Sequence, residues 1–215
     1  MSDILLHGYW RSSAAYRVRI ALNLKGLDYE EVDHDLRTGA QKDPAYRQIA
    51  PAGLVPAVEH DGHAYVQSLA ILEWLEERWV EPALLPRALN DRAIVRGMAL
   101  TVAADIHPLN NLRILRYLKN ELDRPQDQID AWIARWILDG FAALESLVER
   151  HGDGFAFGAS PTIADCFLVP QIFNAERFNV DLSAFPKIVA AAERARALPA
   201  FAAAHPDRQP GAATA

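Results

Sequence analysis

Residues 80–91 divide the sequence into two segments with different hydrophobic patterns. Before them, short apolar runs of strand type alternate with helical patterns; after them, apolar residues recur at spacings of three and four. The dividing stretch, VEPALLPRALND, contains Pro82 and Pro86 and has no clear period, as is typical of a linker. We therefore expect a small α/β domain over residues 1–82 and an all-helical domain over residues 90–215.

The first segment opens with a strand, a helix and a second strand. Ile4–Tyr9 has the pattern of a buried strand, and Ser13–Lys25 has that of a helix stopped by Gly26. Tyr29–Asp33 follows as the next strand. Such a unit predicts a parallel strand pair joined by a right-handed crossover.

Turn and cap signals predict the remaining elements. Asp61-Gly62 is a favoured hairpin turn between two short strands within residues 57–66, and a helix is expected directly after Ser68. In the second segment Thr162 and Asp165 have the spacing of a capping box. The tail from Pro206 is expected to be frayed. Helices are expected over residues 92–119, 126–151, 162–177 and 185–196.

Composition excludes several classes of function. The formal net charge of −6 argues against general nucleic-acid binding. Cys166 is the single cysteine, which excludes an internal disulfide and a thiolate zinc site, and its apolar neighbours predict that it is buried. No apolar run approaches the ~20 residues of a membrane span, and no secretory signal pattern is present at the N-terminus, so we expect a cytoplasmic protein without a membrane partner. The cluster EHDGH, residues 59–63, alternates across a hairpin and is not expected to bind a metal.

Two of the predicted helices begin with polar side chains. Ser12 and Ser13 precede the first helix, and Gln67 and Ser68 precede the helix that follows the hairpin. A helix N-terminus stabilises an anion, and a hydroxyl adds a donor there. On spacing alone, a simple helix cap is the more common explanation of each pair. Two such starts in one small domain are what a peptide-like ligand with separated charges would need.

A polar group in the second segment is open to two interpretations. His107, Asn111 and Arg113 lie beside Pro108, which should kink the predicted helix over residues 92–119. Polar side chains at a kink can border a cleft, or they can satisfy one another between helices. The sequence leaves both interpretations open.

With these motifs assembled, the chain resembles the zeta class of glutathione transferases, which includes glutathione-dependent cis-trans isomerases. The resemblance covers nearly the whole chain. It is carried by an ordered set of motifs: YWRSSAAYRVRIALNLKG, LVPAV, QSLAILEWLEE, DIHPLNN, TIADCFLVPQ and NAERFNVDL. It implies a thioredoxin-like N-terminal domain, an all-helical C-terminal domain, a homodimer and glutathione as cofactor.

The resemblance also assigns roles to individual residues. Ser12 would donate to the glutathione sulfur with Ser13 beside it, and Val55, before a cis Pro56, would pair with the cysteinyl unit. Gln67 and Ser68 would hold the γ-glutamyl end of glutathione, and Gln41 would reach its glycyl carboxylate. His107 and Asn111, from the second segment, are counted as further cofactor contacts that could orient substrate or cofactor, with the role of His107 left open. The family commonly has Ser-Ser-Cys at this turn, whereas Ala14 stands in the third position here. Either that thiol is dispensable for any activity of this chain, or the side activities associated with it are weakened; the hydroxyl that contacts the cofactor is retained.

Isomerisation of a conjugated double bond requires temporary loss of its π bond, which a thiolate can provide by adding to the double bond and leaving again after rotation. The only cysteine is expected to be buried, so an external thiol fits this requirement. The substrates of such a reaction carry carboxylates, which guanidinium groups bind in a bidentate manner. Arg11, Arg177 and Arg113 are the candidates for this contact, and Arg11 is also counted with the catalytic turn.

The favoured hypothesis is a glutathione-dependent isomerase of maleylacetoacetate, acting in aromatic amino-acid breakdown. Maleylpyruvate is the alternative substrate. A general glutathione transferase and a non-catalytic glutathione-binding protein are further alternatives. The sequence does not decide between the two maleyl substrates.

Overall fold

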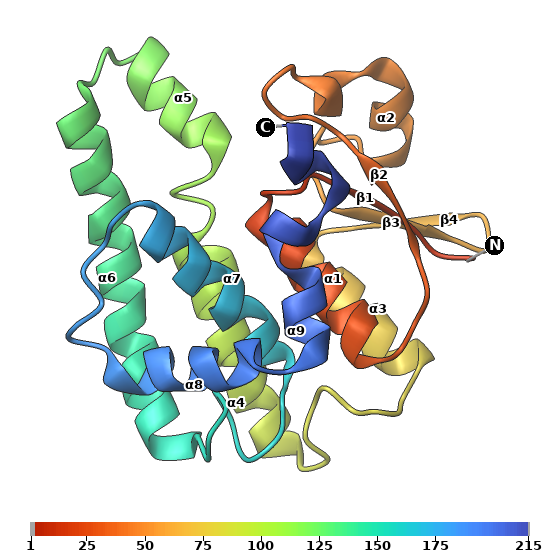
Figure 1. Cartoon of the computed structure of the whole chain (residues 1–215), viewed down its shortest axis with the longest axis vertical. Coiled ribbons are helices and arrows are strands. Elements are labelled where there is room, and N and C mark those ends of the chain that lie inside the picture. The colour runs from red at the N-terminus through yellow and green to blue at the C-terminus, as the bar shows by residue number, and fades with distance from the viewer. Residues whose placement is uncertain (1–2, 215) are drawn as a thin grey trace. The chain divides into compact units, whose positions relative to one another are not determined.

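The computed structural model describes residues 3–214, which form two compact units (Figure 1). The first unit contains the chain up to Leu84 together with the segment from Ala197 onward, and the second is Leu85–Arg196. Each unit is considered by itself below.

A four-stranded sheet forms the centre of the first unit, in the order β2-β1-β3-β4. β1 pairs in parallel with β2, with Leu5 opposite Glu30, and antiparallel with β3. β3 and β4 form the hairpin predicted around Asp61. The parallel pair and the hairpin are thus both confirmed. The strands are β1 (Leu5–Gly8), β2 (Glu30–Asp33), β3 (Ala57–His60) and β4 (His63–Val66).

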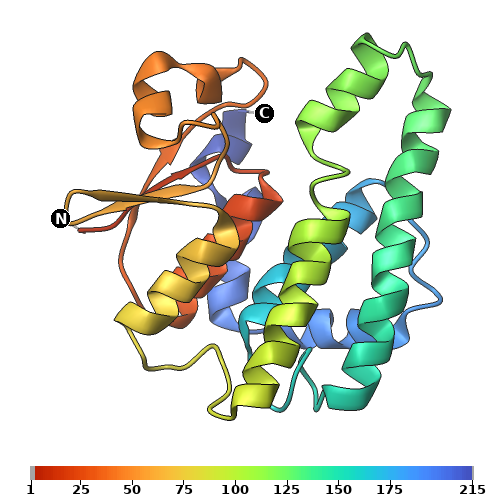
Figure 2. The same ribbon diagram turned by 180° about the vertical axis from the view of Figure 1, so that it is seen from behind.

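Helices cover both faces of this sheet. In the two opposite views α1 and α3 lie on one side of the strands and α2 on the other (Figures 1 and 2). His7 is paired with Ala57 and its ring contacts Tyr46 of α2, so the alternate residues Leu6 and Val58 face the α1 side. The helical elements are α1 (Ser13–Leu24), the 3-10 turn η1 (Ala40–Lys42), α2 (Pro44–Ile49) and α3 (Ser68–Arg78).

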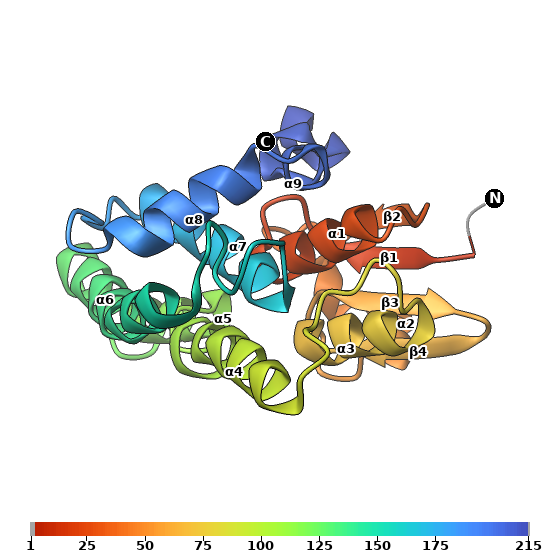
Figure 3. The same cartoon turned by 90° about the horizontal axis from the view of Figure 1, so that it is seen from below.

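The second unit is helical throughout. Its central helix is α7, which contacts α4 and α8 and lies between them in Figure 3. Almost every residue of α7 is buried, as expected of a helix that is apolar on all sides. The capping box of Thr162 and Asp165 at its start is confirmed, and Cys166 is buried as predicted. The helices are α4 (Leu89–Leu100), the π-helical segment η2 (Thr101–Ile106), α5 (Leu112–Asn120), α6 (Gln126–His151), α7 (Ile163–Arg177) and α8 (Pro186–Arg196).

The single helix predicted over residues 92–119 is wrong. The chain passes from α4 into the π-helical turn η2, where His107 N–H donates to the Val102 carbonyl, and leaves helical geometry before α5 begins. Pro108 has no N–H with which to continue the ladder, so the helix is interrupted rather than kinked.

The C-terminal segment differs from the expected domain boundaries and is not frayed. α9 (Pro199–Ala204) packs against α1, and it is followed by the 3-10 turns η3 (Pro206–Arg208) and η4 (Pro210–Thr214). Arg19 of α1 donates to the Ala204 carbonyl, which ties this segment to the first unit.

Within residues 3–214, no helix has the length and apolarity required to cross a bilayer. The same residues contain no group of three His, Cys, Asp or Glu side chains arranged to hold a metal ion.

Candidate functional site

The strand order brings four predicted site segments to one edge of the sheet. Because β2 is parallel to β1, both strands end at this edge, where Gly8 is opposite Asp33. β3 is antiparallel to both neighbours, so it begins there and β4 ends there, with Ala57 opposite Val66. The segments that carry Ser12, Gln41, Val55-Pro56 and Ser68 all adjoin these strand ends.

The edge contains the start of α1, which is preceded by a tight turn. Ser12 N–H donates to the Tyr9 carbonyl at 2.8 Å, and Ser12 Oγ accepts from Ala15 N at 3.2 Å as the helix cap. Ser12 is half-buried and Ser13 is buried in the first turn of the helix. Since Ser12 Oγ accepts its bond from the helix, its own hydrogen can point to an anion placed at the helix N-terminus.

Arg11 precedes this cap and is half-buried. Its guanidinium lies 5.2 Å from the centre of the Trp10 ring, a cation–π distance. A guanidinium that lies against an aromatic ring can also bind a carboxylate through its N–H groups.

A second segment of the edge is the loop before β3. The Val55-Pro56 peptide bond is cis, as the resemblance implied. Tyr46 Oη donates to the Leu54 carbonyl at 2.7 Å, which fixes the loop on α2. Gly53 has a φ of +59°, and a Cβ there would lie 2.9 Å from the Gln41 carbonyl oxygen, so a larger residue would push Gln41 away.

Gln41 of η1 packs against this loop and is 92% buried, with 8% of its surface exposed. Its side-chain oxygen Oε1 is buried and accepts no hydrogen bond from the described residues. A buried polar atom without a partner is costly in a folded protein. Gln41 therefore presents an acceptor that a bound peptide group could satisfy.

The start of α3 forms the third part of the edge. Gln67 is exposed and has a φ of +71°, which turns the chain sharply from β4 into the helix. Ser68 is buried, and its Oγ accepts from Arg17 Nη1 at 3.1 Å. Burial lowers the pKa of Arg17 to about 9, so the guanidinium is still cationic at neutral pH. A buried cation behind Ser68 favours a carboxylate at this helix start.

Arg17 was not predicted as a site residue. It follows Ser13 by four positions and so lies one turn further along the same face of α1. That spacing was visible in the sequence, but its partner Ser68 lies 51 residues away and could be assigned only with the fold.

The remaining predicted residues belong to the second unit. His107 follows η2, and Asn111 caps α5, where its Oδ1 accepts from Arg113 N at 3.1 Å. Arg113 is exposed at the start of α5. Arg177 ends α7 with its guanidinium 4.5 Å from the Phe178 ring centre. Asn111 thus caps its own helix, a local role that differs from both interpretations left open by the sequence.

Two protein-family models match separate parts of the chain. The one described as the glutathione S-transferase N-terminal domain matches residues 11–78, and the glutathione S-transferase C-terminal domain matches residues 126–206.

Proteins similar to this chain along its whole length include isomerases. A probable maleylacetoacetate isomerase of Vibrio cholerae is 44% identical over 99% of this chain and 100% of its own. A solved maleylpyruvate isomerase, described as a bacterial glutathione S-transferase of the zeta class, has a TM-score of 0.93 and 43% identity over 96% of this chain and 98% of its own. The maleylacetoacetate isomerase of Methylobacterium extorquens, solved with bound malonate and glutathione, has a TM-score of 0.93 and 39% identity over 97% of this chain and 99% of its own.

Proposed function

The chain belongs to the glutathione S-transferase family, and on this premise we propose that it is a glutathione-dependent cis-trans isomerase that converts maleylacetoacetate to fumarylacetoacetate. One observation carries the proposal: Ser12, at the start of α1, and Ser68, at the start of α3, stand at the same edge of the sheet. The similarity to an isomerase solved with glutathione and the dicarboxylate malonate supports it.

The residues at the edge fit glutathione. A tripeptide with a carboxylate at each end needs two anion-binding positions and peptide partners between them. The Ser68 hydroxyl, backed by Arg17, suits the γ-glutamyl carboxylate, and the buried orphan acceptor Gln41 Oε1 suits a peptide N–H. We propose Gln41, Val55 with Pro56, Gln67 and Ser68 as the residues that hold the cofactor, with His107 and Asn111 as further contacts.

When bound, glutathione supplies a thiol whose thiolate adds reversibly to the cis double bond and so permits rotation. A free thiol has a pKa of about 8.5, so only a few per cent is ionised at pH 7. Ser12, with Ser13 beside it, presents a hydroxyl and the N-terminus of α1, and both stabilise negative charge on sulfur. These residues therefore raise the thiolate fraction at neutral pH. Ala14 follows them, so the protein itself supplies no thiol there.

The substrate is a dianion, and the protein carries a formal net charge of −6. Local cations must overcome this unfavourable field. We propose that Arg11, Arg113 and Arg177 bind the substrate carboxylates and stabilise the enolate that forms during addition.

Maleylpyruvate is the second candidate substrate, favoured by the structural similarity to a maleylpyruvate isomerase. The two substrates share the maleyl carboxylate and differ beyond the carbonyl. The deciding experiment incubates the protein with freshly generated maleylacetoacetate or maleylpyruvate, with and without glutathione, and follows loss of the cis isomer. We expect faster turnover of maleylacetoacetate, dependent on glutathione; no acceleration on either substrate refutes the isomerase proposal.

Glutathione consumption separates an isomerase from a general transferase. An isomerase regenerates the thiol in each turnover, whereas conjugation consumes it. Binding to immobilised glutathione without turnover would indicate a non-catalytic protein instead.

We also propose a cytoplasmic homodimer that acts in aromatic amino-acid breakdown. Partly exposed apolar side chains on β4 and α3 support self-association: Val66 is 39% exposed, and Tyr65 stacks on Trp74 with ring centres 4.1 Å apart. Sedimentation equilibrium tests this proposal, and a monomer at micromolar concentration would contradict it.

A further inference from the structure

The main chain of Trp10 is held from both sides. Trp10 N–H donates to Asp33 Oδ1 at 3.3 Å, and the Trp10 carbonyl accepts from Arg19 Nη2 at 2.9 Å. That carbonyl belongs to the peptide bond between Trp10 and Arg11, which leads directly into the cap residue Ser12. The orientation of this one peptide therefore sets the starting direction of the turn that carries Arg11 and Ser12.

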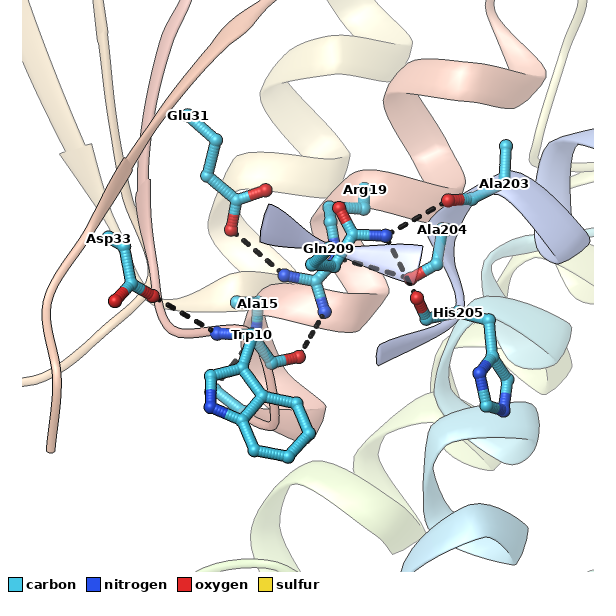
Figure 4. Close-up of polar contacts among 10 residues, drawn as sticks. Trp10, Ala15, Arg19, Glu31, Asp33, Ala203, Ala204, His205 and Gln209 are labelled. Atoms are coloured by element: carbon cyan, nitrogen blue, oxygen red, sulfur yellow. Dashed lines mark hydrogen bonds and ion pairs between the residues drawn. The ribbon is translucent and has the colours of Figure 1, made fainter. Parts of the chain in front are cut away.

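Arg19 connects the turn to two other segments of the first unit (Figure 4). Its side chain is completely buried. Nη1 donates to Glu31 Oε1 at 2.9 Å, and Nε donates to the Ala204 carbonyl at 3.2 Å. The three nitrogen atoms of the planar Arg19 guanidinium thus donate to β2, to the Trp10 turn and to the end of α9.

The C-terminal segment is itself fastened at this point. Gln209 Nε2 donates to the carbonyls of Ala203 and His205, each at 2.9 Å, which closes the chain around the end of α9 (Figure 4). Further along, Gly211 lies against the indole of Trp10: a Cβ at Gly211 would be 2.9 Å from Trp10 Cδ1 and 3.3 Å from Asp33 Oδ1. The C-terminal segment therefore reaches Trp10 both through Arg19 and directly.

We propose that residues 203–211 are a positioning element for the Trp10–Ser12 turn, with Arg19 and Trp10 as positioning residues that act on the reaction through Arg11 and Ser12. The inference deepens the proposed function and rests on it. It also gives Trp10 a role: its two main-chain groups and its ring are the points at which the turn is held.

Lys25 provides a matched comparison within the same helix. It is the buried C-cap residue of α1 and donates to a carboxylate, Glu76 Oε2, and to the carbonyls of Trp79 and Pro82. Its network has the same composition as that of Arg19, but it lies at the opposite end of α1 from the turn. A purely structural role of Arg19 would make the two substitutions alike in every assay.

The test compares Arg19→Met and Gly211→Val with Lys25→Met. The thiolate absorbance of bound glutathione, followed against pH, gives the pKa of the bound thiol. We expect Arg19→Met to raise that pKa by about one unit, a roughly tenfold smaller thiolate fraction at neutral pH, and Gly211→Val to raise it by less. Lys25→Met should lower the melting temperature without moving the thiol pKa. Equal thiol pKa values in wild type and both test variants overturn the inference.

Amide hydrogen exchange of residues 9–13 in the ligand-free protein gives an independent readout. Faster exchange in Gly211→Val than in Lys25→Met is expected, and this comparison decides the matter if Arg19→Met fails to fold. Equal exchange in these two variants overturns the inference. A wild-type protein that binds no glutathione would instead refute the proposed function, and the exchange result would still report whether the C-terminal segment holds the turn.

Discussion

Replacing Lys25 should destabilise the first unit strongly, because it breaks a buried ion pair by removing one partner. Lys25 Nζ donates to Glu76 Oε2 at 2.8 Å, and the two side chains are 0% and 6% exposed. Glu76 Oε2 also accepts from Leu84 N at 2.9 Å. In Lys25→Met the Glu76 carboxylate stays buried without its cation, and the carbonyls of Trp79 and Pro82 lose a donor.

The size of the effect follows from this arrangement. Removing one member of a buried ion pair costs about 3–5 kcal/mol, because the other charge stays uncompensated. For a chain of this length each kcal/mol lowers the melting temperature by about 2–4 °C, so a decrease of roughly 6–20 °C is expected. The same substitution at an exposed pair should cost about 0.5 kcal/mol or less. Arg135 and Asp139 form such a pair, with side chains 71% and 49% exposed.

Scanning calorimetry of wild type, Lys25→Met and Arg135→Met measures these differences. The double variant Lys25→Met with Glu76→Gln provides the internal control, since glutamine keeps an acceptor for Leu84 N and removes the buried charge. It should melt above the single variant. A loss below about 1 kcal/mol for Lys25→Met, or a double variant no more stable than the single one, would refute the reasoning about the uncompensated carboxylate.

Three further substitutions test other parts of the molecule. Ser12→Ala removes the hydroxyl at the start of α1 and should raise the pKa of the bound glutathione thiol by about one unit. Thiolate absorbance measures this pKa, and Ser146→Ala, a change at an exposed serine, is the control. An unchanged titration in Ser12→Ala would exclude the proposed role of the hydroxyl. Ser68→Ala removes the acceptor of Arg17 Nη1 and should weaken glutathione binding about tenfold, measured by calorimetry; equal affinity would place the carboxylate elsewhere. Burial raises the pKa of Asp165 from 3.8 to about 6, so its carboxyl stays protonated in the folded state after it has ionised in the unfolded chain. The free energy of unfolding of wild type minus that of Asp165→Asn should therefore fall by up to about 3 kcal/mol as pH rises from about 4 to about 6, and it should stay level above pH 6. A rise in this quantity over that range would instead contradict the raised pKa of the buried acid.

Elements with local signals were predicted well from the sequence. The hairpin at Asp61-Gly62 formed as predicted because its turn chemistry involves only adjacent residues. The capping box of Thr162 and Asp165 likewise depends on a spacing of three. The parallel pairing of β1 and β2 followed from the strand–helix–strand order, because the crossover rule leaves few alternatives.

Features that depend on distant contacts were not predictable in this way. The tail after Pro206 has a composition typical of frayed ends, yet Gly211 lies against Trp10. Nothing local to either residue indicates the other. A kink was predicted at Pro108, whereas the chain leaves α4 through a π-helical segment and the helix is interrupted there; a proline alone does not distinguish these two outcomes.

The path of the chain through the first unit also determines when that unit can be completed. Arg19 and its acceptor Ala204 are separated by 185 positions. At about 5–20 residues per second, a ribosome adds Ala204 roughly 10–40 s after Arg19. During that interval the strands and α1 are already made, while the helices of the second unit are still being added. The turn that bears Ser12 therefore receives this restraint only after all the helices of the second unit have been synthesised.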